Sequence, residues 1–195
     1  MAYRTFDILL GIPALIICLP VMVVIGTLVR IKMGKGVLFK QRRPGLSGKA
    51  FVMLKFRTMK NLPDDAIDLP DARRITRLGK FLRATSLDEL PELINVVKGD
   101  MSLVGPRPLL MRYLNRYTPE QSRRHNVKPG ITGWAQVNGR NALTWDEKFA
   151  LDLWYVDHQS VSLNLKIIAM TFWKIFKREG ISHPGEATMN EFMGV

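Results

Sequence analysis

Residues 8–29 read ILLGIPALIICLPVMVVIGTLV and contain no charged side chain. At 1.5 Å per residue these 22 positions would form a helix of about 33 Å, long enough to cross the hydrocarbon core of a bilayer. A cleaved signal peptide fits poorly, because Arg4 is balanced by Asp7 and no small-x-small cleavage site precedes Arg30. The segment therefore predicts a membrane helix that stays in the protein.

Two prolines inside this segment bear on its topology. Pro13 and Pro20 each remove one backbone hydrogen bond and tend to kink a helix. They stand seven residues apart, which places them within about 20° of the same face, so their bends should add. Cations flank both ends, Arg4 before the segment and six Lys or Arg between positions 30 and 43 after it. Because neither end is typical of a translocated one, we expect a re-entrant helix with both ends cytoplasmic. A straight spanning helix with a proline kink is the alternative.

Length, charge and cysteine content set limits on the rest of the chain. With 195 residues there is room for one ordinary domain, and we divide the chain into a membrane helix over residues 1–32 and one domain over residues 33–195. The net charge of +12 points to a polyanionic partner: nucleic acid, an anionic membrane surface or a phosphorylated substrate. Cys18 is the only cysteine, which excludes an intramolecular disulfide. The three histidines are scattered, so no zinc site is predicted.

A β-hairpin is expected directly after the membrane segment. Residues 37–41 and 51–59 are typical of strands, and Pro44-Gly45 with Ser47-Gly48 indicates the turn between them. Alternation along the second strand places Lys55 and Arg57 on one face, together with Phe51, Met53 and Met59. Such a cationic face suits an anionic ligand. A solvated basic edge that discourages pairing with another strand has the same pattern.

Two later stretches are typical of amphipathic helices. Residues 73–82 alternate cations with apolar side chains, and residues 163–178 mix the aromatic residues Phe172, Trp173 and Phe176 with lysines and an arginine. Aromatic and cationic side chains together favour the headgroup zone of a membrane. Ordinary packing on the core with a solvated cationic side explains both patterns as well.

Two adjacent carboxylates carry the strongest chemical signal. Ser86-Leu87-Asp88-Glu89 fits a capping box, with Gly99 as the C-terminal stop of the helix. That interpretation needs only Glu89 and leaves Asp88 unexplained; Asp88 could itself be the N-cap, since Pro91 then falls in the first turn. An ionised aspartate at a helix start can also bind Mg²⁺ or attack phosphorus, with Glu89 as ligand or base.

Two loops supply cations that could meet a phosphate. Gly105-Pro106-Arg107-Pro108 restricts the backbone on both sides of Arg107, although a Pro-Arg-Pro turn needs no ligand. Residues 129–140 contain Gly130, Gly133 and Gly139 and end at Arg140. This loop lacks the endings of a P-loop or a Rossmann turn, so by itself it is weak evidence.

Taken in order, these segments resemble the small monotopic phosphoglycosyl transferases, a family of bacterial sugar transferases. The likeness is greatest to members that transfer N,N'-diacetylbacillosamine 1-phosphate to undecaprenyl phosphate, and it covers nearly the whole chain. The matching segments are Lys55-Phe56-Arg57-Thr58-Met59, Ser86-Leu87-Asp88-Glu89-Leu90-Pro91, Lys98-Gly99-Asp100-Met101-Ser102, Gly105-Pro106-Arg107-Pro108, Pro129-Gly130-Ile131-Thr132-Gly133 and Asn138-Gly139-Arg140-Asn141.

The resemblance implies a mainly helical α+β fold: a monotopic membrane protein with a re-entrant helix, interfacial amphipathic helices and a small β-hairpin. It implies residence in the bacterial inner membrane, with the catalytic part at the cytoplasmic face and contact with the lipid of one leaflet. Family members usually have a serine before the kinking proline, whereas Leu19 precedes Pro20 here. The depth and angle of the turn are therefore open.

The resemblance also implies a ping-pong reaction of the EC 2.7.8 type. Asp88 would attack the β-phosphorus of a UDP-sugar, carrying an N-acetylated amino or diamino sugar, release UMP and hold the phosphosugar covalently until polyprenol phosphate takes it. Mg²⁺ would assist at Asp88, and Glu89 would handle metal or protons. Lys55, Arg107 and Arg140 match positions that contact the nucleotide sugar, and Arg57 is a weaker candidate.

The net charge allows a function of a different class. A non-enzymatic basic protein bound to membrane or nucleic acid would use the amphipathic helices and would not need Asp88 or Glu89. No RNA- or DNA-binding motif is present in the sequence, so nucleic acid is not the expected partner. Residue types do not fix the sugar or the oligomeric state.

Overall fold

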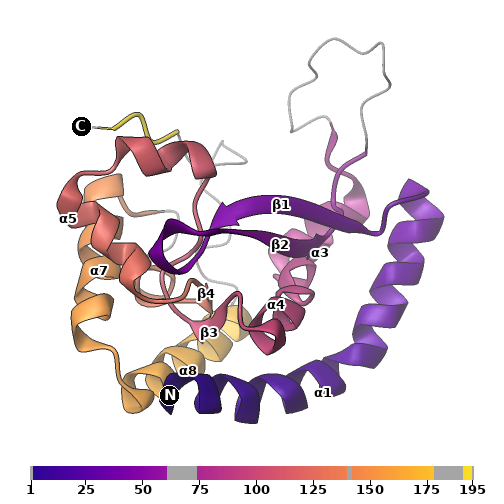
Figure 1. Ribbon diagram of the computed structural model, residues 1–195. Coiled ribbons are helices and arrows are strands. Elements are labelled where there is room, and N and C mark those ends of the chain that lie inside the picture. The colour runs from indigo at the N-terminus through magenta and orange to yellow at the C-terminus, as the bar shows by residue number, and fades with distance from the viewer. Residues whose placement is uncertain (1, 61–73, 140–141, 178–190, 195) are drawn as a thin grey trace.

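The computed structural model describes residues 2–60, 74–139, 142–177 and 191–194. Helices dominate, and two small two-stranded sheets lie among them (Figure 1). The α+β, mainly helical class predicted from the sequence is therefore confirmed. The proposed division at residue 32 stays a prediction.

The first helix, α1, is continuous from Ala2 to Met33 with Pro13 and Pro20 inside it. It is long and apolar enough to cross a membrane, and it follows a curved path around one side of the molecule (Figure 1). Its buried residues are Asp7, Gly11, Ile25 and Val29. The first two are four residues apart, as are the last two, and the second pair follows the first by eighteen residues, so all four share one face of the helix. The prolines lie on the exposed side of the helix. This arrangement agrees with the expectation that the two bends add.

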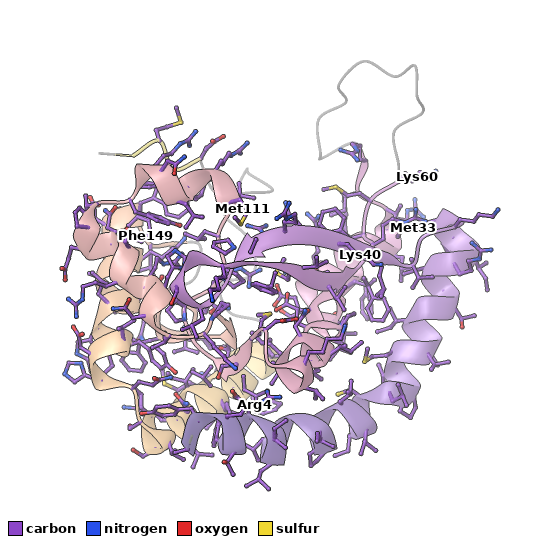
Figure 2. All side chains as sticks on the ribbon, in the orientation of Figure 1. Arg4, Met33, Lys40, Lys60, Met111 and Phe149 are labelled. Carbon is purple, nitrogen blue, oxygen red and sulfur yellow. The ribbon has the colours of Figure 1, made fainter. Side chains whose placement is uncertain are left out.

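Both ends of α1 are attached to the rest of the protein (Figure 2). Near the start, Arg4 donates to the carbonyl oxygens of Val96 and Val97 at 2.6 Å each. Asp7 accepts from the Ser102 hydroxyl at 2.8 Å and from the Leu103 amide. Near the other end, Ile25 and Val29 pack with Phe56 and Leu82 in one apolar cluster.

Between these attachments, much of α1 presents aliphatic side chains to the surroundings. Ile16 and Ile17 are 64% and 75% exposed, and further large apolar side chains stand out along both halves of the helix. Monomeric soluble proteins seldom expose so long an apolar strip. The exposed apolar surface of α1 is consistent with a membrane protein.

The predicted hairpin is present and its turn is placed correctly. Strand β1 (Leu38–Pro44) pairs antiparallel with β2 (Ala50–Phe56), with Leu38 opposite Phe56 and Pro44 opposite Ala50. The connection is the short helix η1 (Leu46–Gly48), in which Ser47 and Gly48 have φ of 54° and 72°. The second strand ends earlier than predicted, and Met59 instead forms an isolated bridge with Ile75.

Helix α3 (Arg77–Ala84) corresponds to the first predicted amphipathic helix, whose expected first residue lies outside the described residues. The Thr76 hydroxyl caps it by accepting from the Gly79 amide. Leu82 is fully buried while Phe81 is 55% exposed. Gly79 is required by space, because a Cβ there would lie 1.9 Å from the carbonyl oxygen of Thr58.

The predicted helix after Ser86 is divided in two. A short turn, η2 (Leu87–Glu89), precedes α4 (Glu92–Lys98), and Pro91 stands immediately before α4. Gly99 ends α4 with φ of 95°, as the sequence indicated. Neither predicted cap is correct: Ser86 has φ of 56° and its side chain does not cap the turn, and Asp88 lies inside η2.

A second sheet was not predicted from the sequence. Strands β3 (Ser102–Val104) and β4 (Gly130–Thr132) run parallel, and the backbones that follow them touch. A Cβ on Gly130 would lie 2.0 Å from the Gly105 nitrogen, and one on Gly133 would lie 2.2 Å from the Gly105 oxygen. The glycines of this loop thus permit contact with the protein's own backbone.

The C-terminal half consists mainly of helices. They are η3 (Met111–Arg116), α5 (Pro119–Ser122), η4 (Arg123–Asn126), α6 (Trp134–Asn138), α7 (Trp145–His158) and α8 (Val161–Lys177). Helix α8 is the second predicted amphipathic helix. Ile167 is fully buried, so the predicted packing of one face on the core is confirmed. Phe172 and Trp173 are 71% and 61% exposed, and their place in the headgroup zone of a membrane stays a prediction.

Candidate active site

One face of the hairpin forms a wall of a cavity of about 520 Å³. Alternate residues of β1 line this cavity, namely Phe39, Gln41 and Arg43, and so do Met53 and Lys55 of β2. The period-2 pattern predicted for Met53 and Lys55 is confirmed. The remaining charged residues around the cavity are Arg57, Lys60, Arg74, Arg83, Asp88, Glu89, Arg107, Arg124, Lys148 and Asp152.

The two predicted catalytic carboxylates are brought to the cavity by η2. The left-handed conformation of Ser86 turns the chain sharply before this helix, and such a backbone in a residue other than glycine is uncommon outside functional or strained turns. Asp88 is 9% exposed. Pro91 stands at the start of α4, and because proline has no N–H group, no backbone donor is left unpaired at this position.

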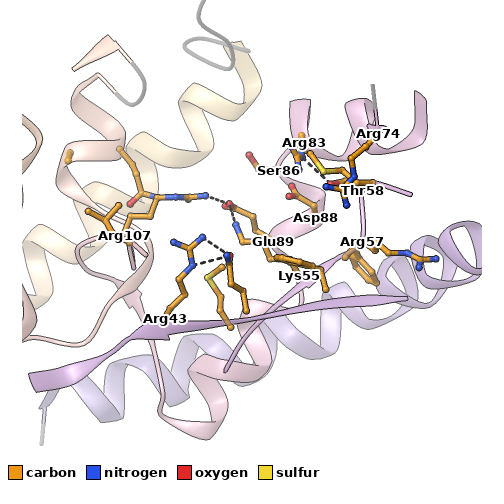
Figure 3. A pocket seen from close by; sticks show the side chains of 18 of the residues that line it. Arg43, Lys55, Arg57, Thr58, Arg74, Arg83, Ser86, Asp88, Glu89 and Arg107 are labelled. Carbon is orange, nitrogen blue, oxygen red and sulfur yellow. Dashed lines mark hydrogen bonds and ion pairs between the residues drawn. The ribbon is translucent and has the colours of Figure 1, made fainter. Parts of the chain in front are cut away.

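Glu89 is held between two cations (Figure 3). Its Oε1 lies 2.6 Å from Lys55 Nζ and 2.6 Å from Arg107 Nη2. Lys55 also lies 3.1 Å from Oε1 of Glu92, a buried residue in the first turn of α4. Three segments that are distant in the sequence thus meet around one carboxylate.

The three carboxylates titrate differently because their surroundings differ. Burial raises the pKa of Asp88, the neighbouring charge of Glu89 raises it further, and Lys55, Arg107 and Arg83 oppose the rise. Burial also acts on Glu89, but Arg107 and Lys55 outweigh it and hold the pKa of Glu89 far below its usual range. Burial and the charge of Glu89 raise the pKa of Glu92 to about 7.

Arg107 is fixed from behind by a buried ion pair. Arg124 Nη2 donates to the main-chain oxygen of Arg107 at 2.8 Å and to Asp152 Oδ2 at 2.6 Å. Arg124 and Asp152 are 3% and 2% exposed. The pair joins η4 and α7 to the loop after β3, so the Pro-Arg-Pro turn is held in place by more than its prolines.

The remaining predicted residues have different positions. Arg57 lines the cavity, but its guanidinium donates to the carbonyl oxygens of Met33 and Gly34 at the end of α1. Lys55 and Arg57 therefore do not reach the same partners, because β2 ends at Phe56. Arg140 lies outside the described residues. The structure thus brings together Asp88, Glu89, Lys55 and Arg107.

Several charged residues of the site were not singled out in the sequence. Arg43 on β1, Arg83 on α3 and Lys148 on α7 line the cavity, and Glu92 lies behind Lys55. Arg43 could have been found from the sequence, because it lies two residues after Gln41 on the strand that pairs with the one carrying Lys55. Arg83 and Lys148 depend on how helices pack and have no comparable signal.

The arrangement suits attack on a phosphoryl group. Among the described residues, no Lys or Arg forms an ion pair with Asp88, whereas Glu89 has two. A buried carboxylate without an ion pair is a potential nucleophile, and the surrounding cations can neutralise the charge of phosphate oxygens. Positioning and electrostatics of this kind are what phosphoryl transfer requires.

Known proteins with similar sequences match most of this chain. The uncharacterized sugar transferase EpsL of Bacillus subtilis (strain 168) is 52% identical over 194 residues, which are 98% of this chain and 95% of EpsL. The UDP-glucose:undecaprenyl-phosphate glucose-1-phosphate transferase of Escherichia coli (strain K12) is 39% identical over 89% of this chain. The undecaprenyl-phosphate galactose phosphotransferase of Salmonella typhimurium (strain LT2) is 38% identical over 91%.

The extent of the match differs among these relatives. The chain spans nearly all of EpsL but only 40% and 41% of the Escherichia and Salmonella proteins. Residues 1–178 match the family described as bacterial sugar transferase. The match takes in α1, the hairpin and all the cavity residues named above, and on this ground the chain belongs to the bacterial sugar transferase family.

Proposed function

We propose that the protein transfers a sugar 1-phosphate from a UDP-sugar to undecaprenyl phosphate and releases UMP. The observation that carries the proposal is the position of Asp88, buried in a cavity walled by cations and next to a glutamate fixed by Lys55 and Arg107. Relatives named as undecaprenyl-phosphate sugar-1-phosphate transferases support it. The enzyme class, a phosphoglycosyl transferase, follows from family membership, and the alternative of a non-enzymatic basic protein is wrong.

The reaction would proceed in two displacements at one phosphorus atom. A carboxylate oxygen of Asp88 forms a bond to the β-phosphorus of the donor, and the bond to the bridging oxygen breaks, so that UMP leaves with the electron pair. An oxygen of undecaprenyl phosphate then bonds to the same phosphorus and Asp88 leaves as a carboxylate. The first step requires Asp88 to be ionised and the second releases it as a carboxylate, and Arg83, Lys55 and Arg107 favour this ionised form.

The roles of Glu89 and the cations follow from their contacts. A carboxylate with so low a pKa takes no proton at neutral pH, so the geometry favours orientation of Lys55 and Arg107, or metal binding, over proton handling by Glu89. Lys55 and Arg107 are the residues that phosphate oxygens of the donor would reach first. Arg57 and Arg140 remain proposed donor contacts.

Mg²⁺ is proposed as the cofactor. Among the described residues, no group of three or more His, Cys, Asp or Glu could hold a metal alone. Mg²⁺ commonly uses one or two protein carboxylates and completes its shell with substrate phosphates and water, so Asp88, with or without Glu89, fits it. The ion would neutralise charge on the donor diphosphate.

For the membrane topology, we propose a re-entrant α1 with both ends at the cytoplasmic face of the bacterial inner membrane. Arg4 and Met33, near opposite ends of the helix, both contact the part of the chain that carries the site. A straight helix across the bilayer would place one of these contacts on the far side. The exposed apolar residues of α3 and α8 would lie in the same leaflet.

The sugar is the least constrained part of the proposal. The names of the Escherichia and Salmonella relatives specify glucose and galactose, whereas the sequence resemblance favours an N-acetylated amino or diamino sugar. We keep the latter as the proposed donor class. UMP release from UDP-hexoses and from UDP-N-acetylated sugars distinguishes the two donor classes.

The test uses purified protein in nanodiscs that contain undecaprenyl phosphate. UMP release is measured with UDP-glucose, UDP-galactose, UDP-N-acetylglucosamine and UDP-N,N'-diacetylbacillosamine, with Mg²⁺ or with a chelator. We expect release from at least one donor, and trapping of labelled phosphosugar on the protein when acceptor is omitted. Asp88→Asn should abolish both signals, while Asp146→Asn, an exposed aspartate on α7, should abolish neither. Turnover by Asp88→Asn would exclude the covalent mechanism.

A further inference from the structure

Arg43 differs from the other cations next to the two catalytic carboxylates. Lys55 and Arg107 both form ion pairs with Glu89. The hydrogen bonds of Arg43 to the described residues go instead to a neutral group: its Nε and Nη2 lie 3.1 and 2.6 Å from Gln41 Oε1. Gln41 and Arg43 are two residues apart on β1, so both side chains face the cavity.

The charge of Arg43 is poorly compensated in the protein alone. Burial lowers its pKa to about 10, and the positive charge of Arg107 contributes to this, while Glu92 only partly opposes it. The guanidinium groups of Arg43 and Arg107 thus face the same cavity, and of these two only Arg107 pairs with Glu89. A bound anion with several oxygens would relieve the repulsion between Arg43 and Arg107 and accept hydrogen bonds from both guanidinium groups.

We propose that Arg43, oriented by Gln41, binds a phosphate oxygen of the donor diphosphate. The proposal rests on the function proposed above and adds a donor-binding residue on β1. A guanidinium can bind a phosphate through two N–H groups at once, and one already held by an acceptor on a rigid strand loses little freedom on binding.

The position of Arg43 favours the soluble donor over the lipid acceptor. Arg43 lies on the Arg107 side of Glu89, at the opposite end of the view from Arg57 (Figure 3). Arg57 contacts the end of the membrane helix. An acceptor whose chain lies in the bilayer beside α1 would approach the cavity from the Arg57 side, which leaves Arg43 to meet the nucleotide.

The experiment measures UDP binding by calorimetry to the full protein in nanodiscs, because UDP carries the nucleoside and the diphosphate of the donor without the transferred sugar. Arg43→Ala should weaken UDP binding about 10- to 100-fold, the range for a lost hydrogen-bonded charge. Gln41→Leu, which removes the orienting amide group and leaves Arg43 in place, should weaken it less, and Arg43→Lys should restore part of the affinity. Arg42→Ala is the matched control, since Arg42 is the exposed neighbour on the opposite face of β1; it should leave UDP binding within about twofold.

Steady-state kinetics distinguish the two phosphate-bearing substrates. Arg43→Ala should raise KM for the UDP-sugar and leave KM for undecaprenyl phosphate unchanged. Equal UDP affinity of the Arg43→Ala and Arg42→Ala proteins, or a rise in KM for undecaprenyl phosphate alone, overturns the proposal. If Arg43→Ala does not fold, Arg43→Lys and Gln41→Leu provide the same comparison. A wild-type protein that binds UDP but transfers no sugar phosphate refutes the proposed function and leaves this test valid.

Discussion

Arg124 donates a hydrogen bond of 2.8 Å to the main-chain oxygen of Arg107, the residue that holds Glu89. The same guanidinium pairs with Asp152 at 2.6 Å, and both partners are buried. The side chains of Asp152 and Arg124 thus connect α7 to the turn that carries Arg107. The site depends on a helix far from it in the sequence.

Removing the carboxylate of this pair should destabilise the protein. Asp152→Asn leaves Arg124 buried without its counter-ion, and breaking a buried pair in this way costs about 3–5 kcal/mol. Asp157→Asn is the control, because Asp157 on the same helix pairs with Arg123 at the exposed surface, where a pair is worth about 0–1 kcal/mol. Thermal unfolding in detergent should show a large loss for Asp152→Asn only. Similar midpoints for the two variants would contradict the structural role of the buried pair.

Glu92 should make stability depend on pH. Its pKa is raised in the folded protein from 4.5 to about 7, so its contribution to stability is complete below pH 4.5 and is lost as the pH rises through 7. The full effect is on the order of 3 kcal/mol. Glu92→Gln stays neutral at every pH and mimics the protonated form beside Lys55, Glu89 and Arg107.

The comparison is therefore between two pH profiles. As the pH rises from 5 to 8, the unfolding midpoint of the wild-type protein should fall relative to that of Glu92→Gln. Parallel profiles would mean that Glu92 is already ionised at pH 5. Glu120→Gln, an exposed position on α5, should follow the wild-type profile.

Lys55 should matter more for turnover than its exposed neighbours do. Lys55→Met removes one of the two cations that hold Glu89 and a candidate phosphate ligand, and the loss of one such group typically lowers kcat by about 10²–10³. The pKa of Glu89 should also rise, because Arg107 alone then opposes burial. Lys40→Met is the control, since Lys40 is exposed on β1 and lies on the other face of that strand. Equal kcat values for Lys55→Met and Lys40→Met would show that Lys55 has no role in turnover.

Local patterns in the sequence predicted the elements that depend on residues close together in the chain. The hairpin, its turn at Ser47-Gly48 and the end of α4 at Gly99 all follow from strand alternation and backbone preference. The pairing of β3 with β4 could not be predicted in this way, because three-residue strands carry no period and their glycines serve a close backbone contact.

The candidate site shows the same limit. The adjacent acids and the fixed arginine were visible as motifs, and the structure brings them together with Lys55. Glu92, Arg124 and Asp152 act through burial and long-range contacts, which depend on how α4, η4 and α7 pack. The cap at Ser86 was wrong because Ser86 takes a left-handed conformation in the turn that presents Asp88, and its side chain does not cap η2.

The attachment of both ends of α1 predicts that they lie on one side of the membrane. Ala2→Cys and Lys35→Cys, each at an exposed position, are introduced into a Cys18→Ser protein that has no other cysteine. A membrane-impermeant thiol reagent should label both from the cytoplasmic side only, in inverted vesicles and not in intact cells. Ile17→Cys, in the middle of the apolar strip, should resist the reagent from either side. If residues 2 and 35 were labelled from opposite sides, α1 would span the bilayer, and the contacts of Arg4 and Arg57 could not exist together in the membrane.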